Sequence, residues 1–368
     1  MLYVTLASIS FLLCQLIVSK RQYLRRYIES RNDAIAVQSA HSGFVPRIGG
    51  LAIFLTFLSM YPFAQYFGIE TNGGKFFLSL LPIVIVGLSE DLGFAISPRN
   101  RMLGIVCSGG LTAYFFNLSV HSVGVPGLDF IFAFAPVGVI VTLFMAAGVT
   151  NAFNLIDGVN GLCGFVTIST ACALAFLSHT SGLPQLETML LIVASVVFGF
   201  FAANYPFGRI FLGDAGAYLL GHTLCWIAIA ILTLRPDISP FAILLIFFWP
   251  VADTLLAIWR RKFNRTATDQ PDRLHFHQLV MRYIEIRFLG RHRRKLSNPL
   301  TVIVLAPMIV SPQIIGLRFA DNNQMAIIAT AGFVVLFVIA YLAGVHSAKN
   351  MGKKLPLIAR TNSGMAAE

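Results

Sequence analysis

The chain has 368 residues, of which 57% are apolar and only 12% are charged, and its mean hydropathy is +0.76. A soluble domain carries about 25% charged residues, so this composition excludes a soluble protein and predicts one surrounded mostly by lipid. The net charge of +11 is concentrated in short connectors between apolar runs. This pattern is typical of a membrane protein facing anionic lipids or phosphorylated substrates, and it speaks against nucleic acid as a partner.

Apolar runs long enough to cross about 30 Å of hydrocarbon recur along the chain. Lipid requires backbone polar groups to be satisfied within helices, and no period-2 pattern indicates a barrel, so we expect an all-α polytopic protein with about 11 transmembrane helices. A basic segment follows the first run in place of a cleavage site, which favours a retained helix. The expected helices lie near residues 2–19, 48–69, 72–89, 102–120, 132–150, 161–178, 188–203, 216–234, 240–259, 300–317 and 324–344.

Positively charged residues predict the orientation. With the N-terminus outside, only Lys75, Arg235 and Arg318 of the 27 Lys and Arg residues fall in outside loops, and this bias places the C-terminus in the cytoplasm. We interpret residues 1–368 as a single transmembrane domain. Residues 260–299 form its main cytoplasmic loop, and residues 353–368 a frayed cytoplasmic tail.

Acidic residues gather at the helix ends on the expected cytoplasmic side. Carboxylates at a membrane edge are costly and indicate function, unless each only caps a helix or pairs with an arginine. Convergent carboxylate oxygens on one leaflet suit a hard divalent cation such as Mg²⁺, so we expect a metal site there. The residues are Glu90, Asp91, Asp157, Asp214 and Asp253.

Two local sequences sharpen this expectation. Asn151, Asn154 and Asp157 follow one another at three-residue spacing, before a glycine-rich turn whose amides can approach an anion such as pyrophosphate. Asp214 lies at the expected start of a helix, between glycines that leave space for a ligand. Glycines also serve helix packing in membranes, and that alternative stays open.

Basic residues and two histidines follow Asp253 on the same side. Arginines suit bidentate phosphate contacts, although a basic cluster beside a membrane also determines topology by touching lipid headgroups. His275 and His277 are two positions apart and would point nearly opposite ways on a helix, so we interpret them as hydrogen-bond donors to phosphate or sugar. The basic and histidine residues are Arg260, Arg261, Arg265, Arg273, His275 and His277.

These segments resemble the polyprenyl-phosphate N-acetylhexosamine-1-phosphate transferases, and among them the WecA branch most closely. The resemblance covers nearly the whole chain and depends on six motifs in the family order. They are His41-xxxx-Pro46-Arg47-x-Gly49-Gly50, the stretch from Glu90-Asp91 to Ser97-Pro98, the stretch from Asn151 to Gly161, Phe211-Leu-Gly-Asp214, Pro250-x-x-Asp253-Thr254, and Asp272-Arg273-x-His275-x-His277.

The resemblance implies a phosphotransferase in the bacterial cytoplasmic membrane that uses Mg²⁺, with Mn²⁺ as an alternative. Such an enzyme moves N-acetylhexosamine-1-phosphate from a UDP-sugar to undecaprenyl phosphate and releases UMP, at the start of O-antigen or another cell-envelope polysaccharide. A homodimer is one assembly that it implies. The implied catalytic residues are Glu90, Asp91, Asp157 and Asp214, the metal ligands Asp214, Asp157 and Asp91, and the substrate-binding residues Arg47, Asn154, Asp253, Arg265, Arg273, His275 and His277.

The chain departs from the family pattern at two positions. Glu90 stands where the family has Asp, and Gln278 stands where it has a third histidine. Because Glu90 keeps the charge, we expect the Glu90→Asp substitution to have a mild or even a beneficial effect on activity. Direct attack by the lipid phosphate is favoured over a covalent aspartyl-phosphate on Asp157 or Asp91. The competing classes are an ion-coupled transporter and a basic membrane scaffold without catalysis.

Overall fold

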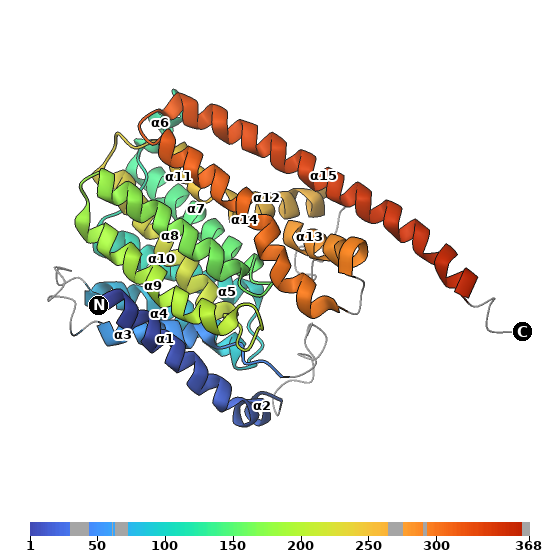
Figure 1. The fold of residues 1–368 in the computed structure, drawn as a ribbon. Helices are drawn as coiled ribbons and strands as arrows, with labels where there is room; N and C mark the ends of the chain where they lie inside the picture. Colours follow the sequence, from blue (N-terminus) through green and yellow to red (C-terminus); the bar gives the residue numbers. More distant parts are fainter. Residues whose placement is uncertain (30–43, 61, 63–72, 264–274, 290–292, 363–368) are drawn as a thin grey trace, which may run out of the picture.

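The computed structural model describes residues 1–29, 44–60, 62, 73–263, 275–289 and 293–362 (Figure 1). Within these ranges every regular element is helical, which confirms the expected all-α class. The helices are α1 (Leu2–Ser19), α2 (Arg21–Glu29), α3 (Gly49–Met60), α4 (Gly73–Asp91), α5 (Pro98–Phe116), α6 (Leu128–Phe132), α7 (Ala135–Leu155), α8 (Leu162–Thr180), α9 (Pro184–Asn204), α10 (Gly213–Leu234), α11 (Pro240–Ile246), α12 (Phe248–Phe263), α13 (Phe276–Ile284), a π-helical turn (Glu285–Leu289), α14 (Arg294–Arg318) and α15 (Asn323–Asn362).

Eight of the described helices are long and apolar enough to cross a membrane, or nine if α11 and α12 count as one bent span. The expected number of eleven is higher for identifiable reasons. The described part of the span near 48–69 is α3, which has 12 residues and is too short by itself. The span near 102–120 falls in α5, whose first turn carries Arg99 and Arg101 and lowers its hydropathy. The protein is therefore a polytopic helical membrane protein with fewer clear spans than its apolar runs suggest.

A sharp bend separates α11 from α12. The two helices meet at 84° across Phe247, which leaves helix-end carbonyls to be satisfied inside an apolar bundle. Gln313 of α14 supplies one of the missing donors, since its amide nitrogen lies 3.3 Å from the Ile246 carbonyl oxygen. The same nitrogen lies 3.2 Å from Thr170 Oγ1 of α8. The bend is therefore held by a buried polar contact between three helices.

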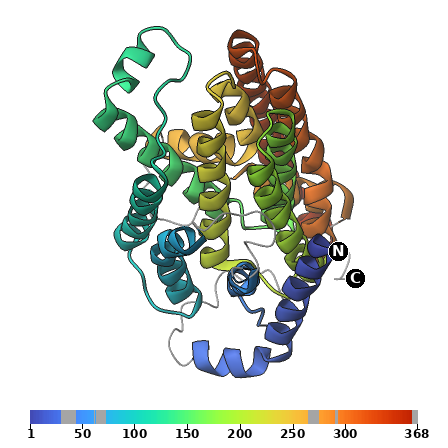
Figure 2. The same cartoon turned by 90° about the vertical axis from the view of Figure 1, so that its left-hand side faces the viewer.

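Helix α10 lies at the centre of the bundle and packs against α3, α4, α7 and α8. In its apolar window 78% of the residues are buried, against 17% in α1 and α15, so the latter two face lipid. Figure 2 shows the blue-green α4 and α5 and the orange-red α14 and α15 on opposite sides of the yellow α10. The residues at the start of α10 are therefore enclosed by several helix ends.

Glycines allow the start of α10 to approach its neighbours closely. A Cβ on Gly50 would collide with the backbone of Gly216, and a Cβ on Gly87 would collide with the backbone of Ala215. In membranes, where packing rather than water release drives association, such small-residue contacts bring backbones together. They hold α3 and α4 against the first turn of α10.

Helix α15 continues beyond the apolar run expected near 324–344. It extends to Asn362 and runs along the edge of the bundle before leaving it (Figure 1). Most of the segment expected to be a frayed tail, residues 353–368, is therefore helical, and residues 363–368 lie outside the described part.

Candidate active site

Two segments far apart in the sequence pair through their backbones and place Arg47. The Phe211 amide donates to the Pro46 carbonyl (2.8 Å), and the Gly49 and Gly50 amides donate to the carbonyls of Phe211 (2.9 Å) and Leu212 (2.7 Å). The first and fourth sequence motifs thereby become one unit. Arg47 lies within it, beside the start of α10.

Gly213, which begins α10, has a conformation and surroundings that require glycine. Its φ is +77°, in the region that side-chain-bearing residues rarely adopt. A Cβ there would also collide with the Arg47 carbonyl oxygen and the Asp91 carboxylate. This glycine therefore permits the close approach of three motifs.

Asp91, the last residue of α4, caps α10 from outside. Its Oδ1 accepts a hydrogen bond from the Asp214 amide (2.8 Å), and its Oδ2 accepts one from the Ala215 amide (3.0 Å). Free amides and the positive end of the helix dipole favour a carboxylate at this place. Asp91 therefore positions Asp214, and both of its oxygens have backbone partners. Its expected role as a metal ligand stays a prediction.

Asp214 connects α10 to α7 and to Arg47. Its Oδ1 accepts a hydrogen bond from Asn154 Nδ2 (2.8 Å) and lies 3.8 Å from an Arg47 guanidinium nitrogen. Asn154 belongs to the last turn of α7. The structure therefore brings together Arg47, Asn154 and Asp214, three residues that the sequence predicts for the site.

Asp157 lies in the turn between α7 and α8 and joins the same group. The Gly213 amide acts to favour its charged form. Burial raises the pKa of Asp157 to about 7, while Arg47 acts to lower it and Asp214 acts to raise it further. A carboxyl in this setting is held close to other acids with too little positive charge to stabilise all of them.

Glu90 adds a fourth carboxyl to this group. Its Oε1 lies 3.1 Å from an Arg101 guanidinium nitrogen at the start of α5. Its Oε2 is buried and has no hydrogen-bond partner within the described part of the chain. The charge of Asp214 acts on it as well. Sequence reasoning missed Arg101. Its position three residues after the Ser97-Pro98 motif could have indicated that it belongs to the site.

The acid cluster, defined as Glu90, Asp91, Asp157 and Asp214, faces two guanidinium groups. Arg47 experiences the charge of all four acids, and Arg101 pairs with Glu90. When all are ionised, four negative charges meet two positive ones. The cluster therefore carries an excess of negative charge, and this excess is its main electrostatic property.

The turn that carries Asp157 is held by two asparagines that sequence reasoning also missed. Asn204 Oδ1 accepts from the Gly161 amide (2.5 Å), and Asn298 Oδ1 accepts from the Asn160 amide (2.8 Å). Both asparagines are buried. In an apolar chain, a buried asparagine at a helix end indicates a backbone group that needs a partner.

A second cluster, the histidine cluster, consists of Asp253, His275 and His277. His275 Nδ1 and His277 Nδ1 lie 3.3 and 3.1 Å from the same oxygen, Asp253 Oδ2. The two rings stack with centroids 5.5 Å apart. The histidines would point opposite ways only if one helix contained both, and that condition is not met, because α13 begins at Phe276 and His275 before it has extended backbone. Arg265 and Arg273, expected beside them, lie outside the described residues.

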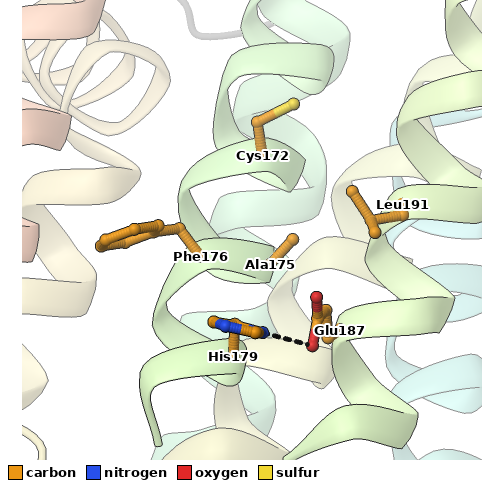
Figure 3. A pocket seen from close by; sticks show the side chains of 6 residues that line it. All are labelled: Cys172, Ala175, Phe176, His179, Glu187 and Leu191. Atoms are coloured by element: carbon orange, nitrogen blue, oxygen red, sulfur yellow. Dashed lines mark hydrogen bonds and ion pairs between the residues drawn. The ribbon is translucent and has the colours of Figure 1, made fainter.

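A hollow of about 330 Å³ lies away from both clusters, between α8 and α9. Figure 3 shows the residues that line it, among them Cys172 and Phe176, with the His179–Glu187 ion pair (3.0 Å) across one end. It lies beside the second half of α8, whereas Asp157 precedes the start of that helix. It contains none of the predicted site residues.

Comparisons with known proteins agree with this geometry. The family model of glycosyl transferase family 4 matches residues 75–232, a range that contains the whole acid cluster. A protein of Bacillus subtilis (strain 168), named probable undecaprenyl-phosphate N-acetylglucosaminyl 1-phosphate transferase, is 28% identical over 68% of this chain and 70% of its own length.

Two further relatives are named undecaprenyl-phosphate alpha-N-acetylglucosaminyl 1-phosphate transferase. The one from Escherichia coli O157:H7 is 27% identical over 66% of each chain, and the one from Yersinia pestis is 28% identical over 66% of this chain and 67% of its own. The matched part thus spans about two thirds of these relatives. The chain is therefore similar to glycosyl transferase family 4 over residues 75–232, the range that contains the whole acid cluster.

Proposed function

We propose that the protein transfers N-acetylglucosamine-1-phosphate from UDP-N-acetylglucosamine to undecaprenyl phosphate and releases UMP. The names of its relatives support this reaction, and so does a polar site at the ends of membrane-length helices. The product would begin a lipid-linked polysaccharide such as O-antigen. The observation that carries the proposal is the acid cluster, in which four carboxyls meet two arginines.

The residues of the acid cluster fit a divalent cation. Carboxylate oxygens are the ligands that Mg²⁺ prefers, and a charge of +2 would balance the excess of negative charge. Asp214 and Asp157 would hold the ion, with Glu90 Oε2 as a further oxygen because it is buried without a partner in the described part of the chain. When bound, Mg²⁺, or Mn²⁺ in its place, neutralises charge on the diphosphate during transfer.

The remaining groups align the two substrates. A phosphate monoester has a second pKa of about 6, so the lipid phosphate is already a nucleophile at neutral pH. Its oxygen forms a bond to the β-phosphorus, the bond to the bridging oxygen breaks, and UMP leaves with that electron pair. Arg47 can contact phosphate oxygens of either substrate, since its side chain is 45% exposed beside Asp214. This direct route needs no aspartyl-phosphate.

We further propose that the site faces the cytoplasm in the inner membrane of a bacterium. The support is the distribution of positive charge, since all but Lys75, Arg235 and Arg318 of the 27 Lys and Arg residues fall on the side expected to carry these helix ends. Nucleotide sugars and the phosphate head of an undecaprenyl lipid meet at that surface. A homodimer belongs to the same proposal.

The deciding experiment measures UMP release by the detergent-purified protein with undecaprenyl phosphate, UDP-N-acetylglucosamine and Mg²⁺. UDP-N-acetylgalactosamine and UDP-glucose serve as alternative donors, and EDTA tests the need for metal. We expect release only when lipid, metal and an N-acetyl donor are all present. Folded protein that releases no UMP with any donor would contradict the proposal and favour a transporter or a scaffold.

A further inference from the structure

Asp253 is buried in α12 and has hydrogen-bond partners on both oxygens. It is 2% exposed. Its Oδ1 accepts from the Phe276 amide (2.9 Å), and its Oδ2 faces Nδ1 of His277 (3.1 Å) and of His275 (3.3 Å). A substrate would find no oxygen of this carboxylate open to it. Asp253 therefore acts on the histidines rather than on a ligand.

The local backbone explains why both histidines reach one carboxylate. His275 has φ −60° and ψ 148°, and the helix begins only at the next residue. Because only His275 has extended backbone, its side chain does not follow the helical rotation that separates the side chains of Phe276 and His277. The Phe276 ring lies 5.3 Å from that of Trp249 and 5.1 Å from that of Phe337, measured between centroids. This aromatic contact anchors the segment and leaves the histidines on the side of Asp253.

His277 directs its second nitrogen toward Gly158. The residue is completely buried, and its Nε2 has no hydrogen-bond partner within the described ranges. A Cβ built on Gly158 would lie 3.0 Å from Nε2, and Gly158 itself is exposed. Buried polar atoms are nearly always paired, so this orphan nitrogen indicates a partner that enters beside Gly158. Asp157 of the acid cluster is the preceding residue.

We propose that Asp253 is a positioning residue for the nucleotide sugar. It holds His277 with the proton on Nδ1, so that Nε2 accepts a hydrogen bond from an N–H or O–H group of the sugar nucleotide bound beside Gly158. A carboxylate that fixes the tautomer of a histidine in this way is a general device. The inference rests on the proposed function, because it takes the nucleotide sugar as the ligand.

Asp253→Asn tests this role without changing the size of the side chain. The asparagine oxygen still accepts from the Phe276 amide, while its NH₂ group faces His277 Nδ1 and favours the other tautomer. Nε2 then carries a proton and faces another donor. Losing one hydrogen bond costs about tenfold in affinity, so we expect the KM for UDP-N-acetylglucosamine to rise about tenfold. The KM for undecaprenyl phosphate should stay within about twofold.

Two further variants make the test specific. His277→Ala should raise the same KM, and adding Asp253→Asn to it should change little more, because residues acting through one contact are non-additive. Gly158→Ala places a methyl group in front of Nε2 and should weaken nucleotide-sugar binding with Asp253 intact.

Asp129→Asn is the matched control. Asp129 also accepts hydrogen bonds from two backbone amides, those of Val123 and Gly124, but it lies near the opposite end of α7.

Calorimetric binding of UDP-N-acetylglucosamine without acceptor separates this inference from the proposed function. If wild type binds the nucleotide sugar and Asp253→Asn weakens binding while no UMP is ever released, the function is wrong and the positioning role stands. Normal turnover with unchanged KM in Asp253→Asn, or strictly additive effects in the double variant, would overturn the positioning role.

The three donor atoms also lie close enough together to hold a metal ion. Metal analysis by mass spectrometry of purified wild type therefore belongs to the same test. About one transition-metal ion per chain that disappears in Asp253→Asn would overturn the proposed role, whereas the absence of such an ion in both proteins is the expected result.

Discussion

The acid cluster and the histidine cluster use the same residue type in opposite ways. In the histidine cluster, both oxygens of Asp253 have partners, and its carboxylate orients the imidazole rings of two histidines. In the acid cluster, four carboxyls share two arginines, and Glu90 keeps a buried oxygen without a partner in the described part of the chain. A satisfied carboxylate positions its neighbours, whereas an unsatisfied group of carboxyls is prepared to bind a cation.

Asp91 lies inside the acid cluster but resembles Asp253 in its contacts. Both of its oxygens accept backbone amides at the start of α10. The comparison therefore divides the acids by the partners of their oxygens rather than by their place in the sequence. Substitutions at Asp214, Gly213, Asp91 and Glu90, in order of decreasing expected effect, test this division and the close approach at Gly213 on which it depends.

Asp214→Asn should have the largest effect. It removes a negative charge from the centre of the acid cluster while keeping the contact with Asn154 sterically possible. We expect UMP release to fall by about a thousandfold or more, since an electrostatic group that acts on the reacting phosphates is lost. Asp129→Asn is the control, and wild-type turnover by Asp214→Asn would show that this carboxylate neither binds metal nor contacts substrate.

Gly213→Ala should damage the fold itself. The new methyl group meets the Arg47 carbonyl oxygen and Asp91 in a backbone conformation that alanine disfavours. We expect the free energy of unfolding to fall by more than about 2 kcal/mol, seen as a lower thermal midpoint in detergent. Gly148→Ala is the matched control, because a Cβ there meets no atom within 4 Å, and equal midpoints for the two variants would contradict the account of Gly213.

Asp91→Asn separates a helix cap from a metal ligand. The amide can accept from one of the two backbone amides of α10 but opposes the other, so stability should fall by about 1–2 kcal/mol. If Asp91 only positions Asp214, the Mg²⁺ concentration for half-maximal turnover should change by less than about threefold while turnover falls. A rise of about tenfold or more in that concentration would instead assign Asp91 to the metal.

Glu90→Asp should have the smallest effect, but it should not improve the enzyme. Aspartate keeps a carboxylate for the cation, but its shorter side chain withdraws from Arg101, whose guanidinium nitrogen lies 3.1 Å from Glu90 Oε1. Such a partly exposed ion pair contributes at most about 1 kcal/mol, so turnover should fall by less than about fivefold. Arg101→Ala should reduce it similarly. An inactive Glu90→Asp variant with intact folding would show that the reach of this carboxylate is essential for the reaction.

Local sequence patterns predicted the membrane class of the protein better than its number of membrane spans. Composition and hydropathy were sufficient for the membrane class, because lipid admits so few backbone arrangements. The number of spans was less certain, since α3, α5 and the bent pair α11–α12 differ from straight helices only in length, charge and a change of direction at Phe247. A hydropathy pattern gives no information on the direction of a helix axis, so it cannot predict the bend between α11 and α12.

The sequence alone predicted the acids and histidines of the two clusters, because such side chains are costly in an apolar chain and indicate function. It did not predict Arg101, Asn204 or Asn298. It could not determine what each predicted residue does. Whether an oxygen of Asp91, Asp214 or Asp253 faces an amide, an arginine, an imidazole or a ligand depends on segments more than 20 residues away in the chain. Only the tertiary structure brings those partners within hydrogen-bond distance. The partner decides whether a carboxylate positions a neighbouring residue or binds a cation or substrate.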